Sequence, residues 1–480
     1  MDNFVTTQSR RSGASYALNR EKRFMTLLHP ELQAALLTEG EKREDYYGKK
    51  ADYWKRHGLL DGTDVRYDGK LTSERVQTTL ANIQQVVFEV TDACNLKCKY
   101  CGYGEYYQGF DVRKHQRMSV ESARQVVDYL KELWNSNRCT STGDLVFFSF
   151  YGGEPLLNVP FIESMIQYIE QAGITNKNIQ YSMTTNAVLL DKYAAFLAEH
   201  AFHLLISLDG NAYHDSYRVT KEGKESFPKV FGNIAYLKEQ YPDYFEKYVN
   251  FNAVLHNRNS ADETYRFIYD TYGKVPTISE LSLSGIRPDK QQEFFALYKN
   301  KTESLSKSEN RADLEKALFV KSSSYYDCAL FLNQFAPGVM KSYQDFFVRY
   351  KKKSYIPTGT CLPFSRKMFI TVNGKILPCE RIGQEHALGK VSEKGVELDP
   401  EFVANEHNSL LDKLRNQCQV CYRASHCIQC VHNVDTIDEA KVVCPAFMSK
   451  KDFERTLEKE MRFLEEHRDE YEKIMNVFLE

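Results

Sequence analysis

Between residues 84 and 285, short β-rich runs alternate with amphipathic segments. The runs predicted as strands are 86–90, 144–151, 179–185, 202–208, 249–255 and 277–283. Apolar residues at helical spacing predict helices at 120–134, 161–172, 190–200 and 261–272. Strands separated by helices favour a parallel sheet with right-handed crossovers. Six units are too few for a closed eight-stranded barrel, so the pattern predicts an α/β fold, an open or partial barrel with its chemistry at the carboxyl ends of the strands.

The flanking segments have other patterns. Residues 1–25 are polar and are predicted to be a flexible tail, and residues 27–60 have a helical pattern that Gly58 would end. A C-terminal helix is expected to pack on the body of the protein through Phe453, Leu457, Met461 and Leu464. We expect five parts: a small helical N-terminal segment that docks a peptide or braces the barrel (1–80), the barrel (81–285), a helical connector (286–354), a cysteine-rich domain (355–447) and the C-terminal helix (448–480).

Composition narrows the class of protein. Hydrophobic residues make up 42% and charged residues 27% of 480, which suits a packed core and not a disordered chain. Sixty-three basic and sixty-five acidic residues leave a net charge of −2, which gives no support for non-specific nucleic-acid binding. Because no apolar run reaches the ~20 residues of a membrane helix and residues 1–20 contain no hydrophobic signal region, we expect a soluble, cytoplasmic protein without a membrane partner.

Ten of the twelve cysteines fall into two groups. In a reducing compartment such grouping indicates metal or redox chemistry, not disulfides. The early group, Cys94, Cys98 and Cys101, lies in the loop after the first predicted strand. A four-cysteine zinc site needs another thiolate, and the next one, Cys139, is 38 residues further on. A [4Fe–4S] cluster normally has four cysteine ligands, so three would leave one iron open to a small molecule.

Three further segments follow predicted strands in order. They are Tyr151-Gly152-Gly153-Glu154-Pro155, Thr185-Asn186, and Ser207-Leu208-Asp209-Gly210 with His214, Asp215 and Arg218 behind it. Glycines permit close backbone approach, and a glutamate can pair with an ammonium group. With the CxxxCxxC spacing, these segments resemble the radical S-adenosylmethionine (SAM) enzymes over residues 84–285, which implies a partial (β/α)6 TIM barrel.

The resemblance implies the cofactor contacts. Cys94, Cys98 and Cys101 would hold a SAM-binding [4Fe–4S] cluster, and Ser207 and Arg218 would hold the SAM carboxylate. The full set of expected SAM contacts is Tyr100, Gly152, Gly153, Glu154, Asn186, Ser207 and Arg218. Reductive cleavage of SAM would give a 5′-deoxyadenosyl radical that abstracts hydrogen from the substrate. The electron would come from a small protein, a flavodoxin or a ferredoxin.

The late cysteine group permits two interpretations. It comprises Cys361, Cys379, Cys418, Cys421, Cys427, Cys430 and Cys444, with residues 368–377 predicted as a hairpin with a type I′ turn at Asn373-Gly374. By spacing alone, two zinc ribbons compete with iron–sulfur clusters.

The late group resembles the SPASM extension of radical SAM enzymes, except that two residues, not three, separate Cys427 from Cys430. The resemblance implies an outer [4Fe–4S] cluster on Cys418, Cys421, Cys427 and Cys444, and an inner one on Cys361, Cys379 and Cys430. The chain would then hold three clusters. Either Cys328 completes the inner cluster or one of its irons stays open.

The resemblance also frames the substrate. SPASM enzymes mostly modify peptides or proteins, and sulfatase maturases carry a proposed aspartate base directly after the cysteine corresponding to Cys379; here that position is Glu380, a candidate catalytic residue. The favoured hypothesis is a maturase that crosslinks or otherwise modifies a ribosomal precursor peptide. The alternatives are an anaerobic sulfatase-maturating type of enzyme, which forms formylglycine on a protein, and a non-enzymatic zinc-ribbon interaction module. The residue modified, the bond formed and the oligomeric state are not indicated by the sequence.

Overall fold

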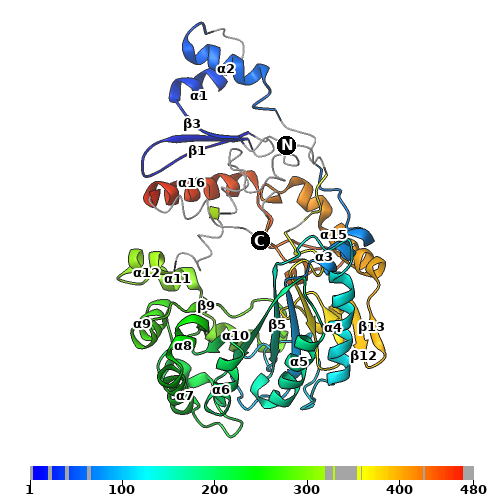
Figure 1. Ribbon diagram of the computed structural model, residues 1–480. Helices are drawn as coiled ribbons and strands as arrows, with labels where there is room; N and C mark the ends of the chain where they lie inside the picture. The colour runs from blue at the N-terminus through cyan, green and yellow to red at the C-terminus, as the bar shows by residue number, and fades with distance from the viewer. Residues whose placement is uncertain are drawn as a thin grey trace. The chain divides into compact units, whose positions relative to one another are not determined.

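The computed structural model describes residues 4–19, 24–37, 43–61, 66–318, 328–329, 354–357, 359–424 and 427–468 (Figure 1). The chain forms two compact units. The barrel unit comprises Leu71–Phe319 and Cys361–His407, and the second unit comprises Met1–Lys70, Val320–Thr360 and Asn408–Glu480. The cysteine-rich segment predicted as one domain is therefore shared between the two units.

The barrel unit is built on a parallel sheet. Its strands β4 to β9 lie side by side in chain order, at Gln85–Thr91, Leu145–Gly152, Asn178–Thr185, His203–Ser207, Val249–Val254 and Thr277–Ser279. All six predicted strands are confirmed, although β9 ends four residues earlier than expected. The partial α/β barrel predicted from the sequence is thus the observed architecture.

Four more strands extend this sheet beyond β4. β10 (Lys367–Ile370) pairs in parallel with β4, and β11 (Lys375–Leu377), β12 (Gly389–Ser392) and β13 (Gly395–Glu397) continue it antiparallel. The predicted hairpin is confirmed as β10–β11, but its type I′ turn is wrong. That turn needs a positive φ at both central residues, and only Gly374 has one, at 79°. Gly374 N–H bonds Thr371 O at 2.9 Å, which makes a type I turn followed by a left-handed glycine.

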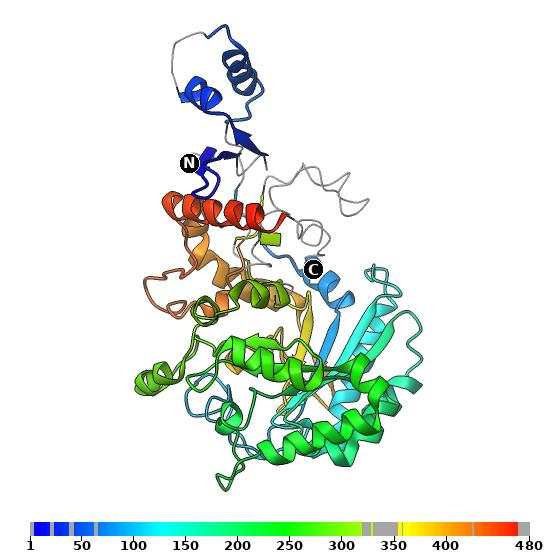
Figure 2. The ribbon, with the colours of Figure 1, turned by 90° about the vertical axis from the view of Figure 1, so that its left-hand side faces the viewer.

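Helices flank the parallel strands (Figure 2). α4 (Val120–Trp134) and α9 (Ala261–Tyr272) have the predicted bounds, and α5 (Val159–Gln171) and α6 (Leu190–Glu199) lie within two residues of theirs. The remaining barrel helices are α3 (Ser73–Ala81), α7 (Phe227–Gln240), α8 (Pro242–Tyr248), α10 (Gln291–Leu297), α11 (Lys301–Ser306) and α12 (Arg311–Ala317). The last three lie in the segment predicted as a helical connector, and of residues 319–353 only Cys328 and Ala329, both helical and buried, lie within the described ranges.

Alternation along the strands separates two environments. Phe88, Phe148 and Phe150 are completely buried in the core beneath the helices. On the opposite face of the sheet the side chains are mostly polar: the hydroxyls of Ser149 and Ser182 are 2.6 Å apart, and Gln85 donates to Ser149 at 2.7 Å. A parallel strand covered on both faces is usually apolar throughout, so the polar face indicates a surface reserved for ligand or substrate.

The N-terminal part of the second unit is a sheet, and the predicted flexible tail is wrong. β1 (Phe4–Gln8), β2 (Ser15–Asn19) and β3 (Phe24–Leu28) form an antiparallel meander. Of the helical pattern predicted for 27–60, the structure confirms α1 (Pro30–Leu37) and α2 (Tyr46–Arg56). Apolar residues from strands and helices, including Ala17, Leu28 and Trp54, bury one another here. The strands form because this packing outweighs the polar residues of β1 and β2.

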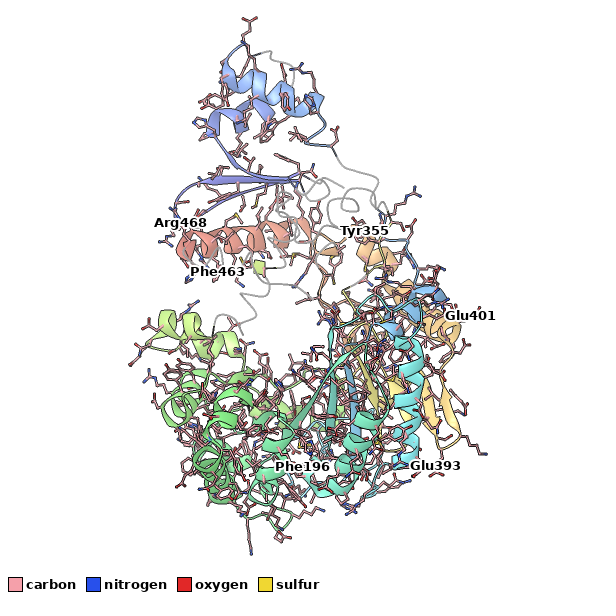
Figure 3. All side chains as sticks on the ribbon, viewed as in Figure 1. Phe196, Tyr355, Glu393, Glu401, Phe463 and Arg468 are labelled. Carbon is pink, nitrogen blue, oxygen red and sulfur yellow. The ribbon has the colours of Figure 1, made fainter. Side chains whose placement is uncertain are left out.

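The C-terminal helix packs as predicted. α16 (Lys450–Glu466) buries Phe453, Leu457 and Met461, half-buries Leu464, and lies against β1 (Figure 3). Its Glu465 carboxylate accepts hydrogen bonds from three hydroxyls, those of Ser9 at 2.8 Å, Ser12 at 2.7 Å and Tyr16 at 2.7 Å. A further long helix, α15 (Pro400–Val420), begins in the barrel unit and ends in the second unit. None of the helices in the described ranges is long and apolar enough to cross a membrane.

Candidate active site

The three early cysteines lie in the loop that follows β4, at the carboxyl end of the parallel strands. All three are half-buried. The loop is pinned by its backbone, since Lys97 N–H bonds Val219 O at 2.7 Å and Lys99 N–H bonds Tyr217 O at 3.0 Å. Cys98 therefore sits between two fixed points.

The glycine pair after β5 packs directly against the start of this cysteine loop. Gly153 N–H bonds Thr91 O, and Glu154 N–H bonds Ala93 O, both at 2.9 Å. A Cβ atom placed on Gly153 would overlap the Ala93 carbonyl oxygen, and Gly152 has a φ of 133°. Both positions thus require glycine, Gly153 for space and Gly152 for conformation.

Glu154 ties together the ends of β5 and β6. Its carboxylate is 1% exposed and accepts hydrogen bonds from Leu156 N–H at 3.2 Å, the Thr185 hydroxyl at 2.7 Å and Asn186 N–H at 2.8 Å. Burial raises the pKa of Glu154 to about 7 in spite of these donors. The side chain expected to meet the SAM ammonium group is therefore also a structural link, and its contact with SAM stays a prediction.

Asn186 reaches the cysteine loop. Its side-chain amide donates to Asn95 Oδ1 at 2.7 Å and to Cys94 Sγ at 3.7 Å. Ser207, at the carboxyl end of β7, is half-buried on the polar face of the sheet. Asn186 and the Gly152–Glu154 segment are thus gathered beside Cys94, and Ser207 ends a neighbouring strand.

Arg218 has protein partners. Its Nε atom lies 3.2 Å from Asp209 and 3.4 Å from Asp215, and its guanidinium is 5.5 Å from the centre of the Tyr100 ring. The Tyr100 hydroxyl donates to Asp209. Sequence reasoning placed Tyr100 and Arg218 at the SAM site but missed the carboxylates beside them. The signal was available, since both aspartates precede Arg218 within the same short segment.

Three of the cysteine sulfurs accept hydrogen bonds from backbone N–H groups, as thiolate ligands often do. The backbone N–H two residues further on points at the sulfur of Cys94, Cys379 and Cys427, each time at 3.4 Å. Such bonds stabilise a thiolate. Burial raises the pKa of Cys98 to about 12 and of Cys379 to about 11, so without a bound cation these groups stay neutral thiols. The donor set fits iron, whose binding would deprotonate them.

The structure brings some of the predicted ligands close together. After burial, the nearby Cys101 thiol contributes to raising the pKa of Cys94 and of Cys98, and Cys421 and Cys427 contribute to raising that of Cys444. Over the described ranges, no three cysteine, histidine or carboxylate side chains converge as ligands of a single metal ion would. The ligands of a four-iron cluster bind different irons, so their sulfurs lie farther apart than ligands of one ion.

The late cysteines divide between the units. Cys361, which is exposed, and Cys379, which follows β11, belong to the barrel unit; Cys418, Cys421, Cys427, Cys430 and Cys444 belong to the second unit. In the second unit Thr360 joins the chain around Cys427 and Cys430, since its hydroxyl accepts from Val431 N–H at 2.8 Å. Cys418 and Cys444 lie in one apolar cluster. The five cysteines of this unit thus lie on segments that pack together.

Glu380 is a half-buried, paired carboxylate. Lys367 Nζ lies 3.1 and 3.0 Å from its two oxygens, and Cys379 Sγ lies 3.7 Å from one of them. Burial raises the pKa of Glu380, but Lys367 and Arg381 outweigh it, so the pKa is lowered. Glu380 is therefore ionised and able to accept a proton.

A second carboxylate on the polar face was missed by sequence reasoning. Glu89, on β4, is 2% exposed and accepts from Val372 N–H at 2.9 Å. Burial raises its pKa to about 7. An acidic residue inside the otherwise apolar run VVFEV was the available signal.

Replacing Glu154 by alanine is expected to weaken SAM binding by roughly one to two orders of magnitude, because a charge-assisted hydrogen bond contributes about 1.5–3 kcal/mol. It should also lower the unfolding free energy, since three buried donors lose their acceptor. Equilibrium dialysis with SAM and anaerobic thermal unfolding measure the two effects. Glu170→Ala, at an exposed position of α5, is the control, and unchanged SAM affinity in Glu154→Ala contradicts the assigned contact.

Taken together, the fold and this site define a partial α/β barrel with a three-cysteine loop at the carboxyl end of its first barrel strand. The sequence profile of the Radical SAM superfamily matches residues 88–268. Residues 88–268 therefore form a radical SAM domain, and the resemblance inferred from the cysteine spacing is confirmed.

Curated relatives share this domain. The cysteine-type anaerobic sulfatase-maturating enzyme of Clostridium novyi (strain NT) is 28% identical over 193 residues, which are 39% of this chain and 48% of that protein. The radical SAM cyclopropyl synthase TigE of Paramaledivibacter caminithermalis is 25% identical over 231 residues, 47% of this chain and 46% of that protein. The chain thus matches about half the length of these relatives.

A solved structure is similar over a longer stretch. Native anSMEcpe with bound AdoMet and Cp18Cys peptide covers 82% of this chain and 99% of its own, with a TM-score of 0.55 and 20% identity. At this identity the likeness shows the fold. It extends beyond residues 88–268 and so includes parts of the chain outside the radical SAM domain.

Proposed function

We propose that the chain is a radical SAM enzyme that abstracts hydrogen from a ribosomal precursor peptide and installs a thioether or carbon–carbon crosslink, or a related modification. The observation that carries the proposal is the packing of the Gly152–Glu154 segment and Asn186 against the cysteine loop. Cys94, Cys98 and Cys101 would hold the cluster, and the polar face of the sheet would receive SAM and the peptide. Bound SAM and the cluster supply radical chemistry; the protein positions the peptide and excludes water.

Glu380 supports a proton-transfer role in this reaction. Loss of a substrate hydrogen atom to the radical and of an electron to an acceptor leaves a proton that a base must remove. Glu380 is ionised, is held by Lys367 and lies beside Cys379, a proposed ligand of the inner cluster. We therefore propose Glu380 as the base.

Replacing Lys367 by methionine is expected to raise the pKa of Glu380, because burial then acts without its main opposing charge. A base works only when deprotonated, so the acidic limb of the pH–rate profile should move to higher pH. The rate of peptide modification between pH 5.5 and 8 measures this (about two units around neutrality). Lys375→Met, which removes the partner of Asp111 at 2.8 Å, is the control; an unmoved acidic limb contradicts the role of Glu380.

Auxiliary clusters on the late cysteines are part of the same proposal. We propose the outer cluster on Cys418, Cys421, Cys427 and Cys444 and the inner cluster on Cys361, Cys379 and Cys430, with Cys328 or an open iron position completing it. Metal analysis after anaerobic purification tests this, because three clusters correspond to about twelve irons per chain. Zinc without sulfide would support a zinc-ribbon interaction module instead. A cytoplasmic location and a flavodoxin or ferredoxin as electron donor are proposed with the clusters.

Sulfatase-type maturation is the second candidate. The similarity to sulfatase-maturating enzymes and a carboxylate directly after Cys379 favour it. Anaerobic incubation with SAM, reductant and either a candidate precursor peptide or a sulfatase-derived peptide separates the two. A mass change with reactivity toward a hydrazide indicates formylglycine, and a mass change without it indicates a crosslink. If neither product forms from any peptide and SAM is not cleaved, both proposed functions are contradicted.

The N-terminal sheet is the proposed peptide-docking surface. Within the described residues β3 pairs only with β2, and Leu27 on β3 is 65% exposed. An extended peptide can add to such an edge by backbone hydrogen bonds. Leu27→Asp is expected to weaken binding of a fluorescent precursor peptide about tenfold by removing an apolar contact. Val112→Asp, at a position of the barrel unit that is 78% exposed, is the control; equal loss in both variants contradicts docking at β3.

A further inference from the structure

Asp209 joins five separate segments of the barrel unit. It is completely buried directly after β7. Its carboxylate accepts from the Tyr100 hydroxyl, from the Arg218 guanidinium at 3.2 and 3.3 Å, and from Val254 N–H at 2.9 Å. Its backbone oxygen accepts from the side chains of Asn259 at 3.2 Å and Thr264 at 3.1 Å. The cysteine loop, the segment after η2 (His214–Tyr217), β8, the loop after β8 and α9 all meet at this residue.

Tyr100 is the point at which the cysteine loop joins this network. It lies between Cys98 and Cys101, and its ring stacks on His256 with centroids 5.5 Å apart. The Tyr217 ring meets it edge-on at 6.4 Å. Ring and hydroxyl are thus both fixed, and the two flanking cysteines cannot shift without moving a fully packed side chain.

We propose that Asp209 is a positioning residue for the cysteine loop: through the Tyr100 hydroxyl it fixes where Cys98 and Cys101 stand, and Arg218 serves to neutralise the buried carboxylate. The proposal deepens the proposed function and rests on it for the role of the cysteines. Two carboxylates, Asp209 and Asp215, share one guanidinium. A buried carboxylate needs such a counter-charge.

The chemistry favours a carboxylate over an amide at this place. Tyrosine hydroxyl, guanidinium and backbone N–H are all donors, and a carboxylate is acceptor-only. An asparagine would turn an N–H₂ group toward one of these donors. Asp209→Asn therefore weakens the hydrogen-bonded link between Tyr100 and residue 209 with little change in side-chain shape.

The test uses the full-length chain with four variants: Asp209→Asn, Tyr100→Phe, the double variant, and Tyr217→Phe as control. Tyr217 belongs to the same aromatic group, but its hydroxyl donates to Asn257 at 2.9 Å and not to Asp209. The first readout is the alkylation rate of Cys98 relative to Cys139 in iron-free protein, with circular dichroism as a check on folding. The second readout is the electron paramagnetic resonance spectrum of the reduced, iron-loaded protein with and without SAM.

The expected result is a rise of about tenfold in relative Cys98 alkylation in Asp209→Asn, the effect of one lost charge-assisted hydrogen bond. The SAM-induced spectral change should be altered in the same variant. Tyr100→Phe should act in the same direction, the double variant should be no worse than Asp209→Asn, and Tyr217→Phe should match the unchanged protein.

Three results would overturn the proposal: unchanged Cys98 alkylation in Asp209→Asn, an equal rise at Cys139, which indicates general loosening, or independent, multiplying effects of the two single variants. Absence of any SAM-induced spectral change in the unchanged protein would count against the proposed function instead. The alkylation ratio would still decide the role of Asp209, because it needs neither iron nor SAM.

Discussion

Replacing Cys94, Cys98 and Cys101 together by alanine is expected to abolish SAM cleavage and leave the iron on the late cysteines in place. The three thiols share one loop, and the late cysteines lie on other segments, five of them in the other unit. A radical SAM cluster without its thiolate ligands does not form, so the loss should be complete. Chromatographic assay of 5′-deoxyadenosine and counting of iron and sulfide measure the two quantities.

Cys139→Ala is the matched control, because this lone, half-buried cysteine belongs to neither group. It should cleave SAM at the normal rate. Continued formation of 5′-deoxyadenosine by the triple variant would refute the radical SAM assignment. Loss of all iron would show that the late cysteines bind metal only when the early site is filled.

Adding a single methyl group at Gly153 is expected to reduce SAM cleavage nearly as much as replacing the three cysteines. In Gly153→Ala the new Cβ atom meets the Ala93 carbonyl, which is backbone and cannot turn away as a side chain could. The end of β5 and the cysteine loop must then separate, which breaks the bonds from Gly153 and Glu154 to residues 91 and 93. We expect SAM cleavage to fall by about two orders of magnitude or more, as overpacking of a tight site costs about 1–3 kcal/mol and displaces the catalytic geometry further.

Gly102→Ala is its control. Gly102 lies beside Cys101 in the same loop, but a Cβ atom there meets no atom within 4 Å. SAM cleavage, thermal unfolding and iron content are measured for both variants. If Gly102→Ala is as inactive as Gly153→Ala, the loop is intolerant of any substitution and the close approach at Ala93 is not the cause.

Sequence reasoning succeeded where the signal is local. The strands of the barrel alternate between a buried face and a polar face, and helices lie between them, two of which begin at a capping serine, Ser119 before α4 and Ser260 before α9. Such patterns need only neighbouring residues. The cysteine loop and the Gly152–Glu154 segment were found in the same way, because each directly follows a strand.

Reasoning from sequence failed where contacts between residues far apart in the chain determine the local structure. Half of the residues in β1 and β2 are polar, and the order of these strands depends partly on α16, more than 400 residues later, whose Glu465 binds Ser9 and Tyr16. The bond from the Tyr100 hydroxyl to Asp209 likewise depends on the approach of the cysteine loop to the segment after β7. The turn at Gly374 was misjudged because Asn-Gly is compatible with two loop lengths, and the closing bond between Thr371 and Lys375 selects the longer one.

The parallel pairing of β10 with β4 joins the cysteine loop and Glu380, the two parts of the proposed chemistry, through one sheet. β4 leads into the cysteine loop, and β10 leads through its hairpin to Cys379 and Glu380; the register of Lys367 with Gln85 fixes one against the other. Backbone pairing cannot slip by a fraction of a residue, and a slip of one residue turns every side chain to the opposite face. The distance between the proposed site of radical formation and the proposed base can therefore change only by whole-residue shifts of strand register. Changes of sequence that adapt the protein to a new peptide are therefore confined to the loops. A gradual change in the distance between the two sites would first have to break the pairing of β4 with β10.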